Sequence, residues 1–442
     1  MNTLKSLAIV CSMLALAACD SSNNNRDRSF NLQVLHGSPD APAVNVLVDG
    51  DTVLSEFDYK EGSGWVNLDE DTYEVQVDGI LPGGDVTVIG PVDLTFDREM
   101  TYTIAAVNDV ANIEPVVIAQ SNEDVAAGSA RLFVLHAAAG APTVDVFVTA
   151  PGADLTASAP VGTFAFKETI GPAEVPAGDY QIRVAVAGDP TAVVFDSGTV
   201  PLNEGDDLVI AAVPNTSGGA APISLVGLVE SGSLELLDVG TPTGLRVGHL
   251  SSDTGPVDVL VNGAEYLTDV PFTAVTGFDP LPADTYNVQV TAADMPGVVA
   301  IGPVDLELEA GTWYSVLAVG EFANIEALIA TDDPRPVATS AKVRIIHAAA
   351  NPAAASVDIY VTAVGADINT EEPALSSVAF KDNTGYIALP AGDYDVTVTV
   401  AGTKNAAIGP ATISIADGDV FTAIARDPVP GETEFGLILL AD

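Results

Sequence analysis

Apolar and polar residues alternate with a period of two along most of the chain, a pattern typical of half-buried strands. Clear examples lie at residues 72–77, 180–184, 286–290 and 394–398. Gly, Pro, Asn and Asp interrupt the alternation at short intervals, and no long stripe of period 3.6 follows the first 18 residues. This spacing predicts about six or seven short strands in roughly 100 residues, which favours β-sandwich domains.

One stretch recurs four times: a strand that ends in histidine, a loop, and a second strand of the type Val-Asp-Val. The chain has four histidines and all of them occupy this position, namely His36, His136, His249 and His347. They are 100, 113 and 98 residues apart, while alternate units are separated by 213 and 211 residues. The segment Ile89–Leu94 recurs unchanged as Ile301–Leu306, in agreement with this pairing. The repeats therefore indicate a two-domain protein that was duplicated once.

The repeats and the polar, Gly- and Pro-rich stretches between them predict the domain boundaries. We expect an all-β chain with four tandem immunoglobulin-like antiparallel β-sandwich domains after a lipoprotein signal peptide. The expected sandwiches cover residues 31–119, 130–230, 244–330 and 341–442. The expected linkers are residues 120–129, 231–243 and 331–340.

A tyrosine begins one strand of each unit just after a tight turn. These residues are Tyr73, Tyr180, Tyr286 and Tyr394. Their placement resembles the tyrosine corner of immunoglobulin-like sandwiches, in which the hydroxyl binds nearby backbone. We expect them, like the four histidines, to be structural motif residues.

The N-terminal residues 1–18 read as an export signal. Lys5 precedes an apolar run over residues 7–18 that is too short to span a bilayer. The run ends in Leu16-Ala17-Ala18-Cys19, which resembles a bacterial lipobox and implies cleavage before Cys19 and lipidation of its thiol. An ordinary secretory signal with a chance cysteine is the alternative. Residues 19–30 are polar and are expected to form a flexible tether.

Lipidation predicts a cell-envelope protein that contacts the membrane through its N-terminal cysteine, on the periplasmic side or at the cell surface. Asp20 resembles a signal that retains lipoproteins at the inner membrane, but the choice of membrane stays open. Cys11 would leave with the signal, so the mature chain would have neither a disulfide nor a thiolate metal site.

The charge balance excludes one class of partner. There are 61 acidic and 15 basic residues, giving a formal net charge of −46, which repels nucleic acid phosphates and anionic lipids. The acidic residues suit a solubilising shell. Capture of divalent cations by clusters such as Asp69–Asp71 and Glu204–Asp207 is the alternative, although no segment has the spacing of a calcium-binding loop.

Parity along the first strand decides how the histidines are interpreted. In the first unit, Leu32, Val34 and His36 share one face, and the other units follow the same order. The opposite face carries Arg131, Arg246, Lys342 and Arg344. We therefore expect each imidazole to point toward the core and to bind backbone in the following loop. A zinc site would need partners that one histidine per unit does not supply.

No constellation predicts catalysis or a cofactor. The polar residues that follow the histidines, Asn45, Asp145, Asp258 and Asp358, have the parity of the outer face, and no serine recurs in register. Phosphate loops, dinucleotide fingerprints and nucleophile elbows are missing from the sequence. Trp65 and Trp313 stand in non-equivalent places and suit core packing, with glycan binding as the alternative.

The histidine loop, the Val-Asp-Val strand and the turn Pro-Ala-Gly-Asp-Tyr at Pro176–Tyr180 and Pro390–Tyr394 resemble the family known as domain of unknown function 4397. Units one and three lack the glycine of that turn. The resemblance covers essentially the whole mature chain. It implies a β-rich domain of secreted and lipid-anchored bacterial proteins, and it implies no catalytic residues.

These observations predict a non-enzymatic, lipid-anchored envelope protein that acts as a structural spacer or as an interaction or adhesion module. Its partner would be another envelope protein or a surface polymer. A straight array of four domains would extend on the order of 100 Å. The alternative is a ligand-binding lipoprotein that presents a polysaccharide, a peptide or calcium to another envelope machine.

Overall fold

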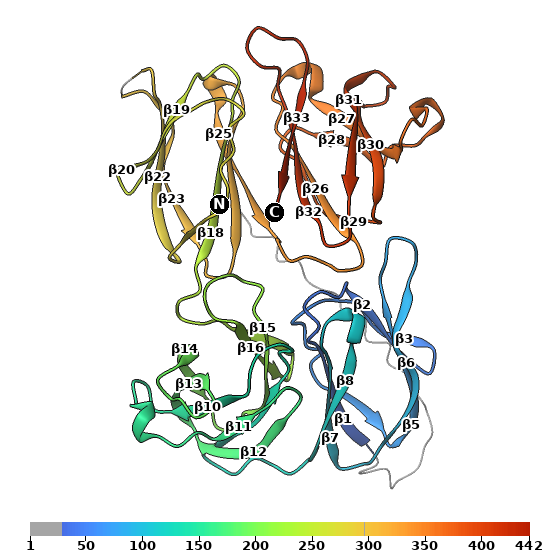
Figure 1. The fold of residues 1–442 in the computed structure, drawn as a ribbon, viewed down its shortest axis with the longest axis vertical. Coiled ribbons are helices and arrows are strands. Elements are labelled where there is room, and N and C mark those ends of the chain that lie inside the picture. Colours follow the sequence, from blue (N-terminus) through green and yellow to red (C-terminus); the bar gives the residue numbers. More distant parts are fainter. Residues whose placement is uncertain (1–28, 296) are drawn as a thin grey trace, which may run out of the picture.

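The computed structural model describes residues 29–295 and 297–442, and nearly all of their regular structure is β-strand. The signal and Cys19 lie outside these described residues. No helix within them is long and apolar enough to cross a membrane. Eight separate sheets face each other in pairs and form the sandwiches numbered 1 to 4 below (Figure 1).

The first two sandwiches contain strands β1 to β17. Sandwich 1 consists of β1 (Ser29–His36), β2 (Val44–Val48), β3 (Asp51–Phe57), β4 (Val66–Asp69), β5 (Asp71–Gly79), β6 (Val86–Phe96), β7 (Met100–Val107) and β8 (Glu114–Ser121), with the 3-10 turn η1 (Val110–Asn112). Sandwich 2 consists of β9 (Ser129–His136), β10 (Val144–Thr149), β11 (Gly162–Phe164), β12 (Thr169–Pro176), β13 (Gly178–Val186), β14 (Val193–Leu202), β15 (Asp207–Pro214), β16 (Ile223–Val229) and β17 (Gly232–Leu236), with η2 (Leu155–Ala157).

The last two sandwiches repeat this order. Sandwich 3 consists of β18 (Thr243–Leu250), β19 (Val257–Val261), β20 (Ala264–Val270), β21 (Asp279–Leu281), β22 (Asp284–Ala292), β23 (Val299–Leu308), β24 (Trp313–Val319) and β25 (Glu326–Asp332), with η3 (Phe322–Asn324). Sandwich 4 consists of β26 (Ala341–His347), β27 (Ser356–Ala363), β28 (Leu375–Ala379), β29 (Asn383–Leu389), β30 (Gly392–Val400), β31 (Ala406–Ile415), β32 (Val420–Arg426) and β33 (Gly436–Ala441), with η4 (Pro352–Ala354) and η5 (Ile368–Thr370).

All four sandwiches have one topology. In sandwich 1 the sheet orders are β4-β1-β7-β8 and β3-β2-β5-β6, and sandwich 2 adds β17 at one edge. We call the sheet that holds the histidine strand the histidine sheet. The predicted tandem β-sandwich class is confirmed. One detail differs, because the histidine strand pairs in parallel with the seventh strand of its sandwich, as β1 does with β7, while its other neighbour is antiparallel.

Two strands extend the sandwiches beyond the expected domain boundaries. β1 begins at Ser29, within the expected tether, and β17 lies within the expected linker of residues 231–243. The polar composition of residues 231–236 suggested a linker, but their backbone pairs with β16 as an edge strand. An edge strand needs fewer apolar residues than a central one because one side of it faces solvent.

The histidine sheets of sandwiches 1 and 2 pack against each other through the faces that are turned away from their own cores. From sandwich 1 this contact includes Leu35, Ala105, Val107 and Ile118. From sandwich 2 it includes Phe133, Leu135, Val209, Ala211, Val226 and Leu228. Each histidine sheet is therefore buried on both faces, as the sheets of layered α/β proteins are.

Sandwiches 3 and 4 pack in the same way. Leu250, Leu317, Val319 and Ala330 of sandwich 3 form one apolar cluster with Ile346, Ala348 and Ile424 of sandwich 4. Adjacent sandwiches thus form two face-to-face pairs, 1 with 2 and 3 with 4. The pairing matches the duplication that the histidine spacing predicts.

The two pairs also contact each other, so the four sandwiches do not form a straight row (Figure 1). Arg335, between sandwiches 3 and 4, is only 9% exposed and donates to the carbonyl oxygens of Pro39 and Ala41 in sandwich 1, at 3.2 and 3.0 Å. Its other terminal nitrogen binds Asp58 at 2.7 Å. The length that we gave for a straight array therefore does not apply to this chain.

Arg335→Ala should loosen the contact between the two pairs, because it removes charged hydrogen bonds worth about 1.5–3 kcal/mol each. We expect small-angle scattering to show a larger radius of gyration for this variant. Arg183→Ala is the matched control, since Arg183 binds Ala153 and Thr149 within sandwich 2. An unchanged scattering profile for Arg335→Ala would contradict the assigned role.

Candidate functional site

The structure buries all four recurring histidines at the end of their strands, and each is 1–2% exposed. Each Nε2 lies within hydrogen-bond distance of a carbonyl oxygen in the loop that follows its own strand. The distances are 3.1 Å from His36 to Pro42, 3.2 Å from His136 to Pro142, 2.7 Å from His249 to Gly255, and 2.7 Å from His347 to Ala354. The imidazole thus ties the loop to the strand in every sandwich.

This geometry fixes the tautomer of each ring. A carbonyl oxygen only accepts, so Nε2 must carry a proton and donate it, and in the neutral ring Nδ1 is then an acceptor. All four Nδ1 atoms are buried and have no hydrogen-bond partner. Burial lowers the pKa of His36, His249 and His347, and the carbonyl bonds oppose this effect. These three rings are therefore neutral at pH 7.

The histidines do not converge with the polar residues that follow them. Asp145 accepts from the backbone of Gly188, and Asp358 accepts from Ser377 and Gly402. Asp258 accepts from the backbone of Asp269, and Asn45 accepts from that of Glu56. These side chains bind the backbone of the second sheet. They do not orient a histidine as a catalytic carboxylate would.

The four recurring tyrosines bind backbone just upstream. Every hydroxyl donates to the carbonyl oxygen four residues earlier: Tyr73 to Asp69 at 3.0 Å, Tyr180 to Pro176 at 2.8 Å, Tyr286 to Pro282 at 2.7 Å, and Tyr394 to Pro390 at 3.0 Å. The bond closes the turn before the strand. It is the geometry of a tyrosine corner.

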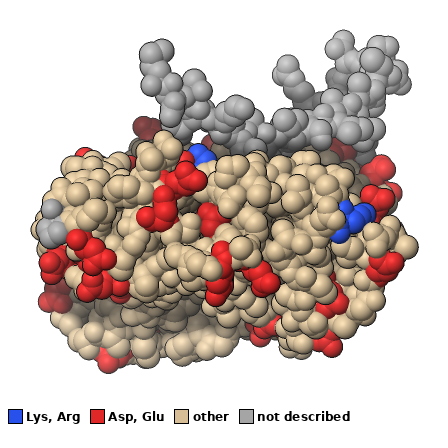
Figure 2. Space-filling model, turned by 90° about the horizontal axis from the view of Figure 1, so that it is seen from above, with Lys and Arg blue, Asp and Glu red and all other residues tan. Residues whose placement is uncertain are grey.

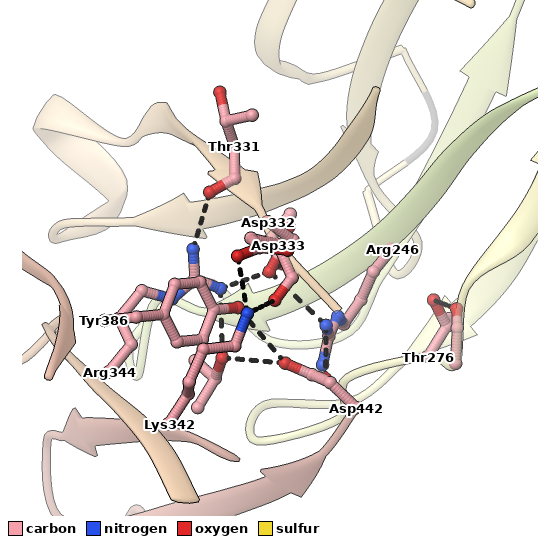
Figure 3. Close-up of polar contacts among 12 residues, drawn as sticks. Arg246, Thr276, Thr331, Asp332, Asp333, Lys342, Arg344, Tyr386 and Asp442 are labelled. Carbon is pink, nitrogen blue, oxygen red and sulfur yellow. Dashed lines mark hydrogen bonds and ion pairs between the residues drawn. The ribbon is translucent and has the colours of Figure 1, made fainter. Parts of the chain in front are cut away.

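The most concentrated group of buried charges lies between sandwiches 3 and 4, and we call it the junction network: Arg246, Asp332, Arg344 and Asp442 (Figure 3). All four side chains are 3% exposed or less. Arg246 lies 2.6 Å from Asp442 and 3.4 Å from Asp332. Arg344 binds the Asp332 carboxylate and also donates to the carbonyl oxygen of Thr331 at 2.8 Å.

Polar neighbours complete the junction network. Ser315 donates to Asp332 at 3.1 Å, and the Thr422 hydroxyl lies 3.0 Å from both Arg344 and Asp442. Burial raises the pKa of the Asp332 carboxyl, while the guanidinium groups of Arg344 and Arg246 oppose that rise. Two cations and two carboxylates balance in charge, which buried ions require.

Arg246 and Arg344 lie on the face opposite the histidine, as the strand parity predicts, but the burial of this face was not predicted. A signal for burial was present: Leu35, Leu135 and Ile346 lie on that same face, directly before the histidine. A strand that is apolar on both faces is typical of a sheet buried on both sides. The arginines outweighed this signal, because charged residues normally indicate a strand face that is exposed to solvent.

Lys342 and Arg131, which share that face, are also buried and paired. Lys342 binds the carboxylate and the carbonyl oxygen of Asp333 in the segment between sandwiches 3 and 4. Burial lowers the pKa of Lys342, and Asp333 opposes the shift. Arg131 donates two hydrogen bonds to Asp207. The two residues form a structural ion pair within sandwich 2, with Arg131 buried.

The two tryptophans do not form an exposed aromatic platform. Trp313 packs edge to face on Phe278 with ring centroids 4.9 Å apart, and its Nε1 is buried without a partner. Trp65 is half-buried, and its backbone N–H donates to Glu230 of sandwich 2. Both residues lie at contacts between sandwiches or close to them.

The surface is acidic, as Figure 2 shows for one face, where Asp and Glu are scattered and Lys and Arg are few. Several of the basic residues bind carboxylates at the junctions. Lys60, Arg246 and Arg344 each bind a carboxylate of another sandwich, and Arg335, between sandwiches 3 and 4, binds one of sandwich 1. Among the described residues, no three His, Cys, Asp or Glu side chains are grouped so that they could hold a metal ion. Cation capture by the surface stays the alternative to a solubilising shell.

Asp332→Ala should destabilise the protein by about 3–5 kcal/mol, because it leaves Arg344 and Arg246 buried with one carboxylate between them. Chemical denaturation would measure this loss. Lys381→Ala is the matched control, since Lys381 and Glu326 also pair across this junction but are 41% and 50% exposed. Such an exposed pair contributes about 0–1 kcal/mol. Equal effects of the two substitutions would contradict the assigned importance of the junction network.

Acid should destabilise the fold below pH 6.5 through the buried neutral histidines. Their folded-state pKa is lowered, so between that value and 6.5 the unfolded chain binds protons that the folded chain does not. The free energy of unfolding should therefore fall as the pH decreases through this window. His249→Gln removes one of the titrating groups and should make the slope shallower by up to about 1.4 kcal/mol per pH unit. Identical slopes would contradict this account.

Comparisons with known proteins identify a family but no activity. The family described as "Domain of unknown function (DUF4397)" matches residues 30–147, 243–360 and 350–442. The first two segments are displaced by 213 residues, the spacing of the sandwich pairs. No curated protein matches. A solved structure of the Bacillus anthracis TIE protein is 12% identical and covers 90% of this chain and 68% of that chain, with a TM-score of 0.15. That score is too low to bear on function.

Proposed function

We propose that this protein, which belongs to the DUF4397 family, is a non-enzymatic lipoprotein of the bacterial cell envelope. In this proposal Cys19 carries the lipid, and the four sandwiches form a folded body that acts as a spacer or as an interaction module next to the membrane. The observation that carries the proposal is the sequence Leu16-Ala17-Ala18-Cys19 at the end of a short apolar run.

The use of the recurring side chains supports a role without catalysis. Histidine is the commonest general base in enzymes, but here each imidazole donates to its own loop and is hidden from solvent. The recurring tyrosines close turns. The residue types that repeat in every sandwich therefore serve the fold.

The charge and the packing support a spacer or interaction module. A body with a formal charge of −46 is repelled by anionic lipid headgroups, so an anchored copy would keep its body away from the membrane surface. The two face-to-face pairs and the Arg335 contact join the sandwiches into one body. Such a body presents its outward loops and sheet faces to partners in fixed positions.

Metabolic labelling with an alkyne-bearing fatty acid tests the anchor. We expect the full-length protein to take up the label in its bacterial host and to sediment with membranes. Cys19→Ser should abolish both results, because no other residue of the mature chain offers a thiol. Cys11→Ser is the matched control and should remain labelled. An unlabelled wild-type protein that stays in the soluble fraction would overturn the proposal.

A further inference from the structure

The interior of sandwich 3 contains a cavity of about 80 Å³ between its two sheets. Its lining comes from both sheets and is dominated by valine, including Val247, Val259, Val270, Val288, Val290 and Val316. In the interior of sandwich 2, by contrast, the cavity measures about 20 Å³. The volume of the cavity in sandwich 3 is several times the roughly 10–15 Å³ that one water molecule needs.

One position distinguishes sandwich 3 from sandwiches 1 and 2. The first valine of the second strand pairs with Phe57 in sandwich 1 and with Phe164 in sandwich 2, but with Val270 in sandwich 3. Sandwich 4 also has a valine at this position, Val378. Both phenylalanines are buried in their cores, at 7% and 1% exposure. Valine fills less of the core than phenylalanine does, so Val270 contributes to the space in sandwich 3.

The cavity reaches the surface between two edge strands. Its lining includes Val304 on β23 and Ile329 on β25, which are 48% and 49% exposed. β23 is the edge of one sheet and β25 is the edge of the other. Sandwich 1 carries the equivalent exposed pair, Val92 and Val117, on β6 and β8. That pair lies on a sandwich whose core holds Phe57, so the two sites form a natural comparison.

The chemistry of the lining selects an apolar occupant. The Tyr266 hydroxyl already donates to Asp279 at 2.8 Å, and His249 Nε2 is bound to Gly255. The remaining buried polar atom is Nδ1 of His249, an acceptor with no partner. A water molecule in a site of this size needs two to four polar partners, so water would be held poorly here. A hydrocarbon group forms no hydrogen bonds with water, so it loses none when it enters such an apolar cavity.

The rim restricts the head of the occupant. Asp305 lines the cavity at its exposed side, and the protein as a whole is strongly acidic. A carboxylate or phosphate at the entrance would be repelled. An uncharged hydroxyl head meets no such penalty.

We propose that sandwich 3 is a binding site for a slender uncharged amphiphile, whose single alkyl chain enters between β23 and β25 and fills the cavity. This function goes beyond the proposed spacer role and does not depend on lipidation of Cys19. It assigns different tasks to sandwiches that share one fold. Sandwich 1 has the same apolar rim but places Phe57 in its core, while sandwich 3 has the rim together with Val270 at the equivalent position.

Titration of the full-length chain with 1-decanol tests the site directly. We expect saturable binding of one molecule per chain by calorimetry, and NMR shifts confined to the valine, leucine and isoleucine methyl groups of sandwich 3. Decanoate should bind at least tenfold more weakly at pH 8 because of its charge. Absence of saturable binding, or shifts spread equally over all four sandwiches, would overturn the proposal.

Two variants separate the cavity from the rim. Val270→Phe restores the ring present in sandwiches 1 and 2 and should abolish decanol binding without lowering the melting temperature. Val304→Asp should weaken binding at least tenfold by placing a charge at the entrance. Val92→Asp makes the same change at the equivalent position of sandwich 1 and should leave binding unchanged. If Val270→Phe fails to fold, the two rim variants decide the question, and equal affinities for them would refute the site.

Discussion

The contact between histidine sheets is the constraint on which the rest of the structure depends. It buries Leu35 and Leu135 in one pair and Ile346 in the other, on strand faces that an isolated sandwich would expose to water. Burial of apolar area contributes roughly 25 cal/mol per Å², so a sandwich separated from its partner would lose stability and expose a large apolar patch. The folding unit is therefore the pair, and the duplication copied a pair.

The two pairs meet this constraint with different chemistry at the same positions. Three residues before the histidine stand Gln33 and Phe133 in the first pair but Arg246 and Arg344 in the second. The first contact is mostly apolar, and the second contains the junction network. Pairing sandwich 3 with sandwich 2 would place Arg246 against Phe133 and leave its charge without Asp442. Four similar domains in one chain risk such misassembly, and a buried charge without a partner is a strong penalty against it.

Much of the fold was predictable because its signals are local. The period of two, the loop after His36 and the turn before Tyr73 are each determined within about ten residues, and the repeats multiplied the evidence. The face-to-face pairing was not predicted, because it depends on which sheet face meets another domain. The strand pattern around Arg344 is consistent with an exposed face as long as its partner, Asp332, is unknown. The cavity also escaped prediction, since Val270 is an ordinary core residue until its neighbours are placed.

The junction network and the cavity lie on opposite faces of one strand. In β18, Arg246 faces sandwich 4, while Leu245, Val247 and His249 line the interior. Removing core volume destabilises an isolated sandwich, since the lining loses packing contacts that nothing replaces. In sandwich 3 the outer face of the same strand is held by ion pairs and by the apolar contact with sandwich 4. The partner domain thereby fixes the position of β18 independently of how well the interior is filled. A sandwich supported from outside can keep a hollow core, and the pairwise architecture is what makes that possible.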